Sequence, residues 1–541
     1  MSQTPVSASG VPLPTSPTGT SLQRLAEQYW HRDGGQSELH FEGGRWTSSE
    51  LADRTKRLAG GLRGAGVKPG DRVVICMANC TEVGVTYHAL WRLGAVATPV
   101  LFLLSEDELR HVLTDSGAVL VVTTPEFLPK VTAATSAVPT VLGVVVAGQH
   151  DQDATGADGP ALLDFAVLEQ AQPADLVDTD PAGLAALLYT GGTTGRSKGV
   201  MISHNALSAA AWAATATSYD PKQRTVLLPL PLSHVYGLMV SVMSLHSPEP
   251  NVVVLMRWFD PAGWLQLAQK HRVNGSPLVP SMLQMLLQQP LEDYDLAPLT
   301  RLNSGAAPLP RQVLEDFGRR LPQVEIAEGY GCTESAAIIA TSPLGQARPG
   351  SVGKPAPGVD VRIELPDGNE AAPGADGEIC VRGAVLMTGY WHAPDATAEA
   401  LRGGHLHTGD VGRLDADGYL YIVDRIKDLI IRGGFNVYPR DVEDVLVRHP
   451  DVVAAATVGR PDEKYGEEVV AFVQLTPGST VTPAELVEFA REHLSAAKYP
   501  REVRIVDSIP LTSVLKTDRK RLRSQLISEQ DTGVRGVVPP R

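Results

Sequence analysis

The segment that most constrains this chain is an apolar run, residues 185–189, that continues into a loop rich in glycine and threonine. Positions 190–199 hold four glycines, three threonines and one lysine. The apolar run predicts a buried strand. Glycines let backbone N–H groups approach an anion, hydroxyls add donors, and Lys198 adds a positive charge. The segment therefore predicts a polyphosphate-binding loop, although Gly199 after Lys198 departs from the G-x-x-x-x-G-K-[ST] spacing. A long surface turn is the alternative.

Composition limits the class of protein and its partners. With 541 residues the chain is too long for one core and predicts at least two domains. A net charge of -14 argues against general affinity for nucleic acid or an anionic membrane. The four cysteines are too scattered for a disulfide framework, and no apolar run reaches about 18 residues. Residues 1–20 also lack a signal pattern. We expect a reduced, cytoplasmic protein with no membrane span.

Strand and helix patterns alternate through the first part of the chain. Strands are expected over 71–77, 96–100 and 119–123, with helices over 82–93 and 106–116 between them. This rhythm predicts an α/β fold with parallel sheets covered by helices on both faces. Ser48 or Ser49 is expected to cap a helix over 50–63. Met282 and Met285 are expected to pack into the core.

The loop resembles a known family. Residues 189–199, Tyr-Thr-Gly-Gly-Thr-Thr-Gly-Arg-Ser-Lys-Gly, are similar to the phosphate loop of the adenylate-forming superfamily, which includes fatty-acid–CoA and 4-coumarate–CoA ligases, peptide-synthetase adenylation domains and luciferases. The family usually has Ser at the place of Gly191 and often Pro at that of Ser197. The resemblance extends over about residues 22–526.

The resemblance implies a domain organisation. A large N-terminal domain over 21–423 would combine parallel sheets sandwiched by helices with a β-barrel-like part. A hinge over 424–427 would lead to a small, mobile α+β domain over 428–527. Polar tails would precede residue 21 and follow residue 527.

The resemblance also implies the nucleotide-binding residues. Those of the phosphate loop are Thr190, Gly191, Gly192, Thr193, Thr194, Gly195 and Lys198. Those of the adenine side are Gly305, Ala306, Glu328, Gly329, Tyr330 and Gly331, with Tyr330 stacked on the ring. Thr333 would reach the α-phosphate. Glu334 would hold Mg²⁺, which commonly takes one carboxylate together with substrate phosphates.

Later segments complete the expected nucleotide site. Asp410 would accept the ribose hydroxyls, Arg425 would be a second ribose contact, and Lys427 would lie at the hinge. Lys516 would bind where the acid meets the α-phosphate, and a cation there stabilises charge in the transition state. Lys516, Thr193 and Glu334 are therefore the expected catalytic residues. A glycine usually precedes this lysine, and Leu515 replaces it here.

The acid and the thiol have their own expected residues. By the resemblance, the acid pocket is lined by His234, Tyr236, Gly237, Val240 and Ser304. A mainly apolar pocket with one phenol suits a fatty or an aryl (cinnamate- or benzoate-like) acid. Arg257 is expected to contact the nucleotide end of CoA. Gly433 and Gly434 are expected to leave a passage for its pantetheine arm.

These expectations describe an AMP-forming acid–thiol ligase that uses ATP, Mg²⁺ and coenzyme A. Its partners would be a small carboxylic acid, ATP and CoA, with a separate acyl carrier protein as an alternative acceptor, in a monomer or homodimer. Two alternatives stay open. One is an adenylating enzyme of specialised metabolism that passes its acid to a carrier protein or an amine, or activates another oxyacid. The other is a nucleotide-binding regulator without turnover.

Overall fold

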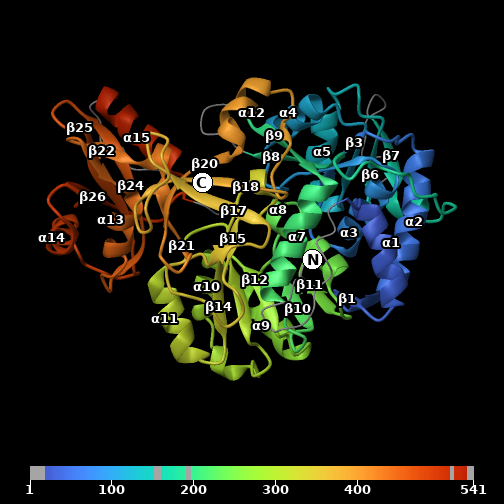
Figure 1. The fold of residues 1–541 in the computed structure, drawn as a ribbon, viewed down its shortest axis with the longest axis horizontal. Coiled ribbons are helices and arrows are strands. Elements are labelled where there is room, and N and C mark those ends of the chain that lie inside the picture. Colours follow the sequence, from blue (N-terminus) through green and yellow to red (C-terminus); the bar gives the residue numbers. More distant parts are fainter. Residues whose placement is uncertain (1–18, 151–159, 191–195, 512–516, 533–541) are drawn as a thin grey trace. The chain divides into compact units, whose positions relative to one another are not determined.

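The computed structural model describes residues 19–150, 160–190, 196–511 and 517–532. The chain forms two compact units, and Figure 1 follows it from one end to the other. The first unit comprises Met1–Val361, Cys380–His407 and Gly418–Leu420; the second comprises Arg362–Ile379, Thr408–Asp417 and Tyr421–Arg541. The expected hinge over 424–427 stays a prediction. No helix among the described residues is both long and apolar enough to cross a membrane.

An eight-stranded sheet of the first unit carries the predicted phosphate loop. Its strands, in spatial order, are β19 (Gly389–Tyr390), β9 (Lys198–Ser203), β8 (Leu184–Thr190), β4 (Val96–Pro99), β3 (Arg72–Cys76), β5 (Leu120–Thr123), β6 (Gly143–Val146) and β7 (Ala161–Asp164). From β8 to β7 neighbouring strands are parallel. The strands β4, β5 and β6 are buried along their whole length, as expected of parallel strands with helices on both faces.

A nine-stranded sheet forms the rest of the first unit's framework. Its order is β16 (Lys354–Pro355), β15 (Ala340–Thr341), β14 (Glu325–Tyr330), β13 (Arg301–Ser304), β12 (Gly275–Leu278), β10 (Thr225–Leu228), β11 (Val252–Leu255), β1 (Glu38–Phe41) and β2 (Gly44–Thr47). The strands from β14 to β1 are parallel. Their carboxyl ends therefore lie at one edge of the sheet.

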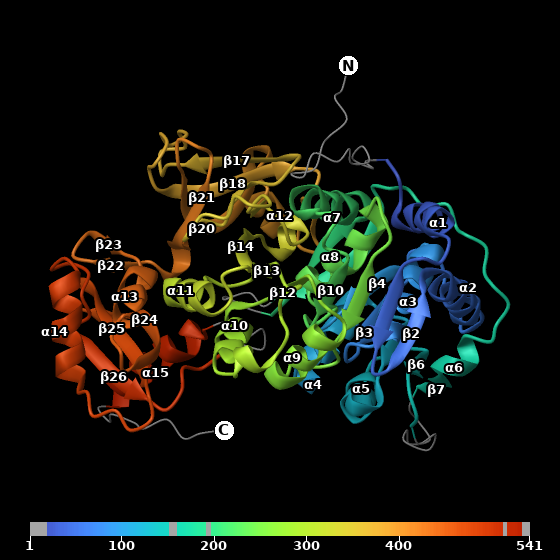
Figure 2. The same ribbon diagram turned by 90° about the horizontal axis from the view of Figure 1, so that it is seen from below.

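Helices pack on these sheets. They are α1 (Leu22–Asp33), α2 (Ser48–Gly64), α3 (Thr81–Arg92), α4 (Glu106–Ser116), α5 (Leu128–Thr135), α6 (Phe165–Leu168), α7 (His204–Ser218), α8 (Val235–Met243), α9 (Pro261–Lys270), α10 (Pro280–Leu287), α11 (Arg311–Arg320) and α12 (Pro394–Ala400). The helices α1, α2 and α3 pack together (Figure 1), and α10 packs against both α9 and α11 (Figure 2).

Two local predictions were wrong. Thr47, rather than Ser48 or Ser49, caps α2, because its hydroxyl accepts from the Glu50 N–H while the Glu50 carboxylate accepts from the Thr47 N–H, forming a capping box. Met282 is buried as expected, but Met285 is 42% exposed. The buried face of α10 is formed by Pro280, Met282, Leu283 and Leu286, and Met285 lies outside it.

The second unit has its own sheet and core. Its strands are β23 (Phe435–Val437), β22 (Ile430–Arg432), β25 (Gly466–Leu475) and β24 (Val452–Asp462), with β26 (Glu502–Val506) paired to β25. The helices are α13 (Pro439–Leu446), α14 (Pro483–His493) and α15 (Arg519–Thr532). A further sheet has the order β17 (Val359–Glu364), β18 (Gly377–Gly383), β20 (Leu406–Leu414) and β21 (Leu420–Arg425), and the division between the units crosses its strands. The fold is thus mixed α/β, with helix-sandwiched parallel sheets and a smaller C-terminal unit.

Candidate functional site

The base of the predicted phosphate loop is a hairpin. The strands β8 and β9 pair antiparallel, and Thr190 lies directly opposite Lys198. Residues 191–195, which include the expected contacts Gly191, Gly192, Thr193, Thr194 and Gly195, lie outside the described residues. The pairing still fixes where the loop leaves and re-enters the sheet. Lys198 Nζ lies 5.3 Å from the ring centroid of Tyr390 on β19.

The predicted adenine side forms at the carboxyl edge of the nine-stranded sheet. Ser304 of β13 lies opposite Glu328 of β14 in the parallel register, so the segments that follow both strands leave the sheet side by side. Glu328 is buried, and its carbonyl accepts hydrogen bonds from the N–H and hydroxyl of Ser342. Ala306 has a φ of 69°. A non-glycine residue in this region is strained, and such strain is concentrated at functional sites.

The turn after β14 is the most constrained part of this edge. A Cβ on Gly331 would lie 2.1 Å from the carbonyl oxygen of Ala337, so only glycine fits. Ala336 and Ala337 have φ of 48° and 84°. The Ile339 N–H donates to the carbonyl of Tyr330 at 2.8 Å and closes the turn. The short helix η4 (Thr333–Ser335) is held inside this turn. Thr333 and Glu334 are therefore presented by a rigid backbone.

Glu334 is the carboxylate in this turn that fits a magnesium ion. The Tyr390 hydroxyl donates to Glu334 Oε1 at 2.8 Å. Among the described residues, Oε2 has no protein hydrogen-bond donor, so a hard oxygen is left for a cation. Burial, reinforced by the neighbouring Glu334 charge, raises the pKa of Tyr390 well above its usual range. The phenol therefore stays protonated and remains the donor.

The predicted acid-binding residues meet at the start of α8. His234 caps this helix by accepting from the Tyr236 N–H at 3.3 Å. Gly237 is required because a Cβ there would lie 2.1 Å from the Pro231 carbonyl oxygen. Val240 lies one turn further along α8 and is partly buried. His234 and Gly237 therefore both shape the backbone at the start of α8.

Tyr236 brings the acid side next to the adenine-side loop. A Cβ on Gly305 would lie 3.3 Å from Tyr236 Cε1, so the phenol ring packs on this glycine. Burial raises the pKa of Tyr236, while the Arg301 guanidinium lowers it. Ser304, which precedes Gly305, is 3% exposed, and its Oγ has no hydrogen-bond partner among the described residues. A buried hydroxyl without a partner is an exception in folded proteins and calls for an explanation.

Arg257, the expected CoA contact, lies elsewhere in the first unit. Its guanidinium donates to Glu42 at 2.7 Å and to Glu126 at 2.9 Å. It lines a cavity of about 340 Å³, whose other charged side chains are Arg54, Glu82 and Glu169. Arg54 donates to both of these carboxylates. The arginines of this cavity are therefore neutralised by protein carboxylates.

In the second unit, Asp410 and Arg425 are partners. Arg425 Nε donates to Asp410 Oδ1 at 2.9 Å, which joins the predicted ribose contacts although 15 residues separate them. The Asp410 side chain is 7% exposed and that of Arg425 is 46% exposed. Lys427 lies in the following 3₁₀ turn, η6 (Ile426–Asp428). The preceding Asp424 accepts from the N–H groups of Arg425 and Arg440, so its carboxylate is anchored within this unit.

Gly433 and Gly434 form a two-residue turn between β22 and β23. Arg432 lies opposite Phe435, and the glycines have φ of 57° and 82°. Positive φ at both central positions is the requirement of a type I′ hairpin, which explains the glycine pair locally. A Cβ on Gly434 would meet nothing within 4 Å. Lys516, expected in the same unit, lies outside the described residues.

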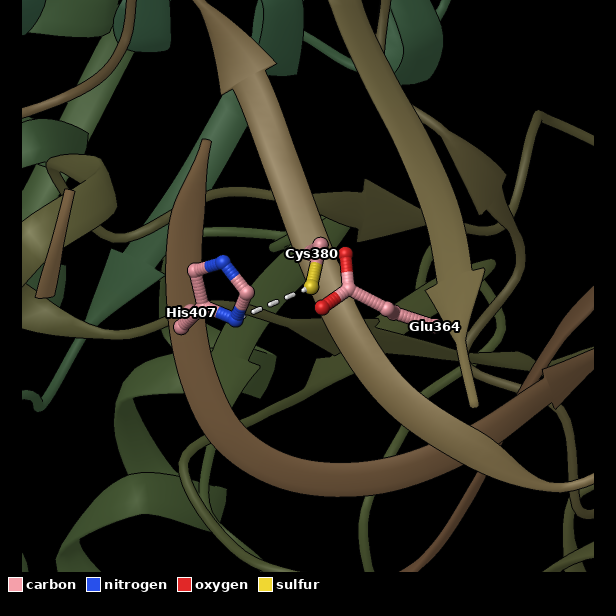
Figure 3. A group of neighbouring side chains, drawn as sticks. All are labelled: Glu364, Cys380 and His407. Atoms are coloured by element: carbon pink, nitrogen blue, oxygen red, sulfur yellow. Dashed lines mark hydrogen bonds between the residues drawn. The ribbon is translucent and has the colours of Figure 1, made fainter. Parts of the chain in front are cut away.

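A cysteine and a histidine of the first unit face each other. Cys380 Sγ lies 3.3 Å from His407 Nδ1 (Figure 3). Thiolate and imidazole are zinc donors, but a structural zinc site takes four ligands. Glu364, which Figure 3 also draws, belongs to the second unit. All four cysteines are free thiols.

Two site residues were missed from the sequence. Tyr390 is 56 residues from Glu334, and no local pattern links the two. Arg301, 1% exposed, donates to Glu325 and to the Ser342 carbonyl beneath the adenine-side edge. Arg301 lies in the mostly polar strand Arg-Leu-Asn-Ser, which gives no local signal of a buried arginine.

Comparison with known proteins gives consistent matches over most of the chain. Residues 26–391 match the family model of the AMP-binding enzyme, and residues 441–516 match that of the AMP-binding enzyme C-terminal domain. The chain is 33% identical to a long-chain-fatty-acid–CoA ligase of Bacillus subtilis (strain 168), over 95% of each chain. It is 37% identical to a feruloyl-CoA synthase of Amycolatopsis, over 88% of this chain and 93% of the relative. The amide bond synthetase McbA from Marinactinospora thermotolerans matches with a TM-score of 0.83 at 31% identity, over 93% of this chain and 99% of the other.

Proposed function

The chain belongs to the AMP-binding enzyme family, and from this premise we propose which acid it activates and how its residues divide the work. It is an AMP-forming acid–thiol ligase whose substrates are ATP and coenzyme A, and the family generally requires Mg²⁺. A carboxylate oxygen attacks the α-phosphorus of ATP, and the bond to pyrophosphate breaks. The thiol of CoA then attacks the acyl carbon of the adenylate, and AMP leaves.

Positioning and charge neutralisation supply most of the rate in phosphoryl chemistry. The phosphate loop, residues 190–198, binds the triphosphate, with Thr193 and Lys198 as donors. Glu334 would hold Mg²⁺, which when bound neutralises phosphate charge. Lys516 neutralises the charge that develops at the α-phosphate. The remaining nucleotide contacts are the adenine-side residues Gly305, Ala306, Glu328, Gly329, Tyr330, Gly331 and Thr333, and the ribose pair Asp410 and Arg425.

The proposed acid is an aryl acid that carries a ring hydroxyl, of the hydroxycinnamate class. One observation carries this choice: the Ser304 hydroxyl is buried without a partner, next to the glycine on which Tyr236 packs. An alkyl chain offers that hydroxyl no partner, whereas a hydrogen bond to a ring hydroxyl would contribute about 1 kcal/mol. The ring hydroxyl of such an acid would give the Ser304 hydroxyl a hydrogen-bond partner. The chain is similar both to a feruloyl-CoA synthase and to a long-chain-fatty-acid–CoA ligase, so both classes of acid belong in the test.

A second group is a candidate for the acceptor that takes the acyl group from the adenylate. The likeness to an amide bond synthetase favours an amine as an alternative to the CoA thiol. For CoA, the open space at Gly434 in the hairpin turn of the second unit suits a thin pantetheine arm. The two acceptors differ in product, so mass spectrometry separates thioester from amide.

The test is a panel of acids with ATP, Mg²⁺ and either CoA or an amine. We expect pyrophosphate release and a CoA thioester with 4-hydroxycinnamate, less turnover with cinnamate, and least with a long-chain fatty acid. Ser304→Ala should lower kcat/KM for 4-hydroxycinnamate about fivefold while leaving cinnamate unchanged, because only the first loses a hydrogen bond of about 1 kcal/mol.

Ser276→Ala is the matched control on the neighbouring strand β12. Its hydroxyl donates to the Leu227 carbonyl at 2.7 Å and accepts from the Trp264 indole N–H at 3.2 Å, so this variant loses buried hydrogen bonds without a change in acid preference. If wild type preferred the fatty acid, or if Ser304→Ala lowered both aryl acids equally, the proposed substrate class would be wrong.

A further inference from the structure

Tyr390 is tied to Glu334 through both side chain and backbone. Its hydroxyl donates to Glu334 Oε1 at 2.8 Å, and three residues earlier the Met387 N–H donates to the Glu334 carbonyl at 2.8 Å. The segment 387–390 therefore holds the carboxylate and its backbone together. A carboxylate with one oxygen fixed in this way directs its second oxygen in a defined direction.

The same segment is fastened to the exit of the phosphate loop. The strand β19 pairs antiparallel with β9, and Tyr390 lies opposite Val200. The Trp391 N–H donates to the Gly199 carbonyl at 2.7 Å, and the Thr388 N–H to the Met201 carbonyl at 2.9 Å. Tyr390 thus connects Glu334 to the strand that starts at Lys198.

The ring of Tyr390 also contacts Lys198 directly. The ammonium lies 5.3 Å from the ring centroid, within the range of a cation–π interaction. One side chain therefore contacts both the cation of the phosphate loop and the carboxylate of the Thr-Glu turn. Among the described residues, no other side chain is recorded in contact with both.

We propose that Tyr390 is a positioning residue that orients the Glu334 carboxylate for the Mg²⁺ that accompanies ATP. The inference rests on the metal-binding role proposed for Glu334. Partners that hydrogen-bond to a metal ligand fix its orientation, and their removal typically weakens metal affinity by about 10–100-fold. The Tyr390 hydroxyl makes no contact with substrate in this role, so its removal, with the ring kept, should act only through the metal.

The test is Tyr390→Phe, which keeps the ring and its packing but removes the hydroxyl. We expect the Mg²⁺ concentration for half-maximal pyrophosphate release to rise about tenfold, with kcat restored at saturating Mg²⁺. Isothermal titration with a non-hydrolysable ATP analogue should show weaker binding in the presence of Mg²⁺ and unchanged binding in its absence. Thioester formation from a preformed acyl-adenylate should be unchanged, because that step involves no triphosphate.

Tyr419→Phe is the matched control. Its hydroxyl donates to the Gln346 carbonyl at 3.2 Å, so this variant also loses one phenolic hydrogen bond in the first unit. Its Mg²⁺ dependence should equal that of wild type. A thermal unfolding curve for each variant reports any general loss of structure.

Two further outcomes separate this inference from the function on which it rests. Glu334→Gln should raise the Mg²⁺ requirement more than Tyr390→Phe, and adding Tyr390→Phe to it should change nothing further. If Glu334→Gln alters Mg²⁺-dependent binding but Tyr390→Phe does not, the positioning role is overturned and the metal role stands. If neither variant alters it, the metal role of Glu334 fails as well.

Discussion

Two turns of this protein use glycine for opposite reasons. In the Thr-Glu turn of the first unit, Gly331 is required for space, because a Cβ would lie 2.1 Å from the Ala337 carbonyl oxygen. In the hairpin turn of the second unit, Gly434 is required for conformation, with a φ of 82° and nothing within 4 Å of its Cβ position. The first turn is packed and strained, which suits a fixed metal ligand. The second is open, which suits the passage of a flexible ligand arm.

The largest expected effect is that of a substitution at Gly331, in the packed turn. Gly331→Ala should lower the free energy of unfolding by about 3 kcal/mol, because the new methyl group meets backbone that cannot move aside without disrupting the turn. Adenylation should fall with it, since Glu334 is displaced. Chemical denaturation followed by pyrophosphate release measures both effects. Gly318→Ala, in the last turn of α11 with nothing within 4 Å, is the control and should leave both unchanged or raise stability slightly. Equal stability of the two variants would contradict the packed character of the turn.

The burial of His204 in the first unit can be tested by measuring how the free energy of unfolding depends on pH. His204 is fully buried, its ring nitrogens have no hydrogen-bond partner in the described part of the chain, and burial lowers its pKa to about 4. The unfolded chain, with an imidazole pKa of about 6.5, binds the proton more readily than the folded one. Stability should therefore fall as pH falls from about 6.5 to 4, by up to about 3 kcal/mol from this residue.

The variant that checks this prediction is His204→Leu. Denaturation curves at pH 7 and pH 4 should show a smaller acid loss for the variant than for wild type. His150→Leu, at a partly exposed histidine whose Nδ1 contacts the Gly148 carbonyl, is the control. An unchanged pH dependence in His204→Leu would show that water reaches the ring.

The smallest expected effect on stability is that of a substitution in the open hairpin turn of the second unit. Gly434→Ala should cost about 1 kcal/mol of stability, because alanine is strained at positive φ although it meets no neighbour. Gly478→Ala, at a φ of 86° with nothing within 4 Å, should cost the same. Only Gly434→Ala should slow thioester formation relative to pyrophosphate release, as measured by quenched-flow mass spectrometry. Equal slowing of both half-reactions would argue against a passage at this turn.

Local patterns predicted the parts of the molecule that depend on local chemistry. The apolar run and glycine-rich segment gave β8 and the loop position, because strand burial and backbone flexibility are properties of consecutive residues. The parallel sheets followed from the alternation of strands and helices. The cap of α2 was misplaced by one residue, because hydroxyls at three consecutive positions all satisfy the pattern and only Glu50 decides among them.

Contacts between distant segments could not be predicted in this way. The Tyr390–Glu334 hydrogen bond depends on how β19 returns to pair with β9, and the pairing of Asp410 with Arg425 depends on the register of separate strands. The unpaired hydroxyl of Ser304 is likewise a property of packing. The ion pairs of Arg257 could not be predicted either, since its carboxylate partners Glu42 and Glu126 are 215 and 131 residues away.

The distribution of thiols gives the protein an intrinsic reporter. Cys76, Cys80 and Cys380 are buried, and burial raises the pKa of the Cys76 thiol to about 11, so these groups react slowly with alkylating reagents. Cys332 is only partly buried and immediately precedes Thr333 and Glu334. A fluorophore attached there would sense the occupancy of the nucleotide side without any engineered cysteine.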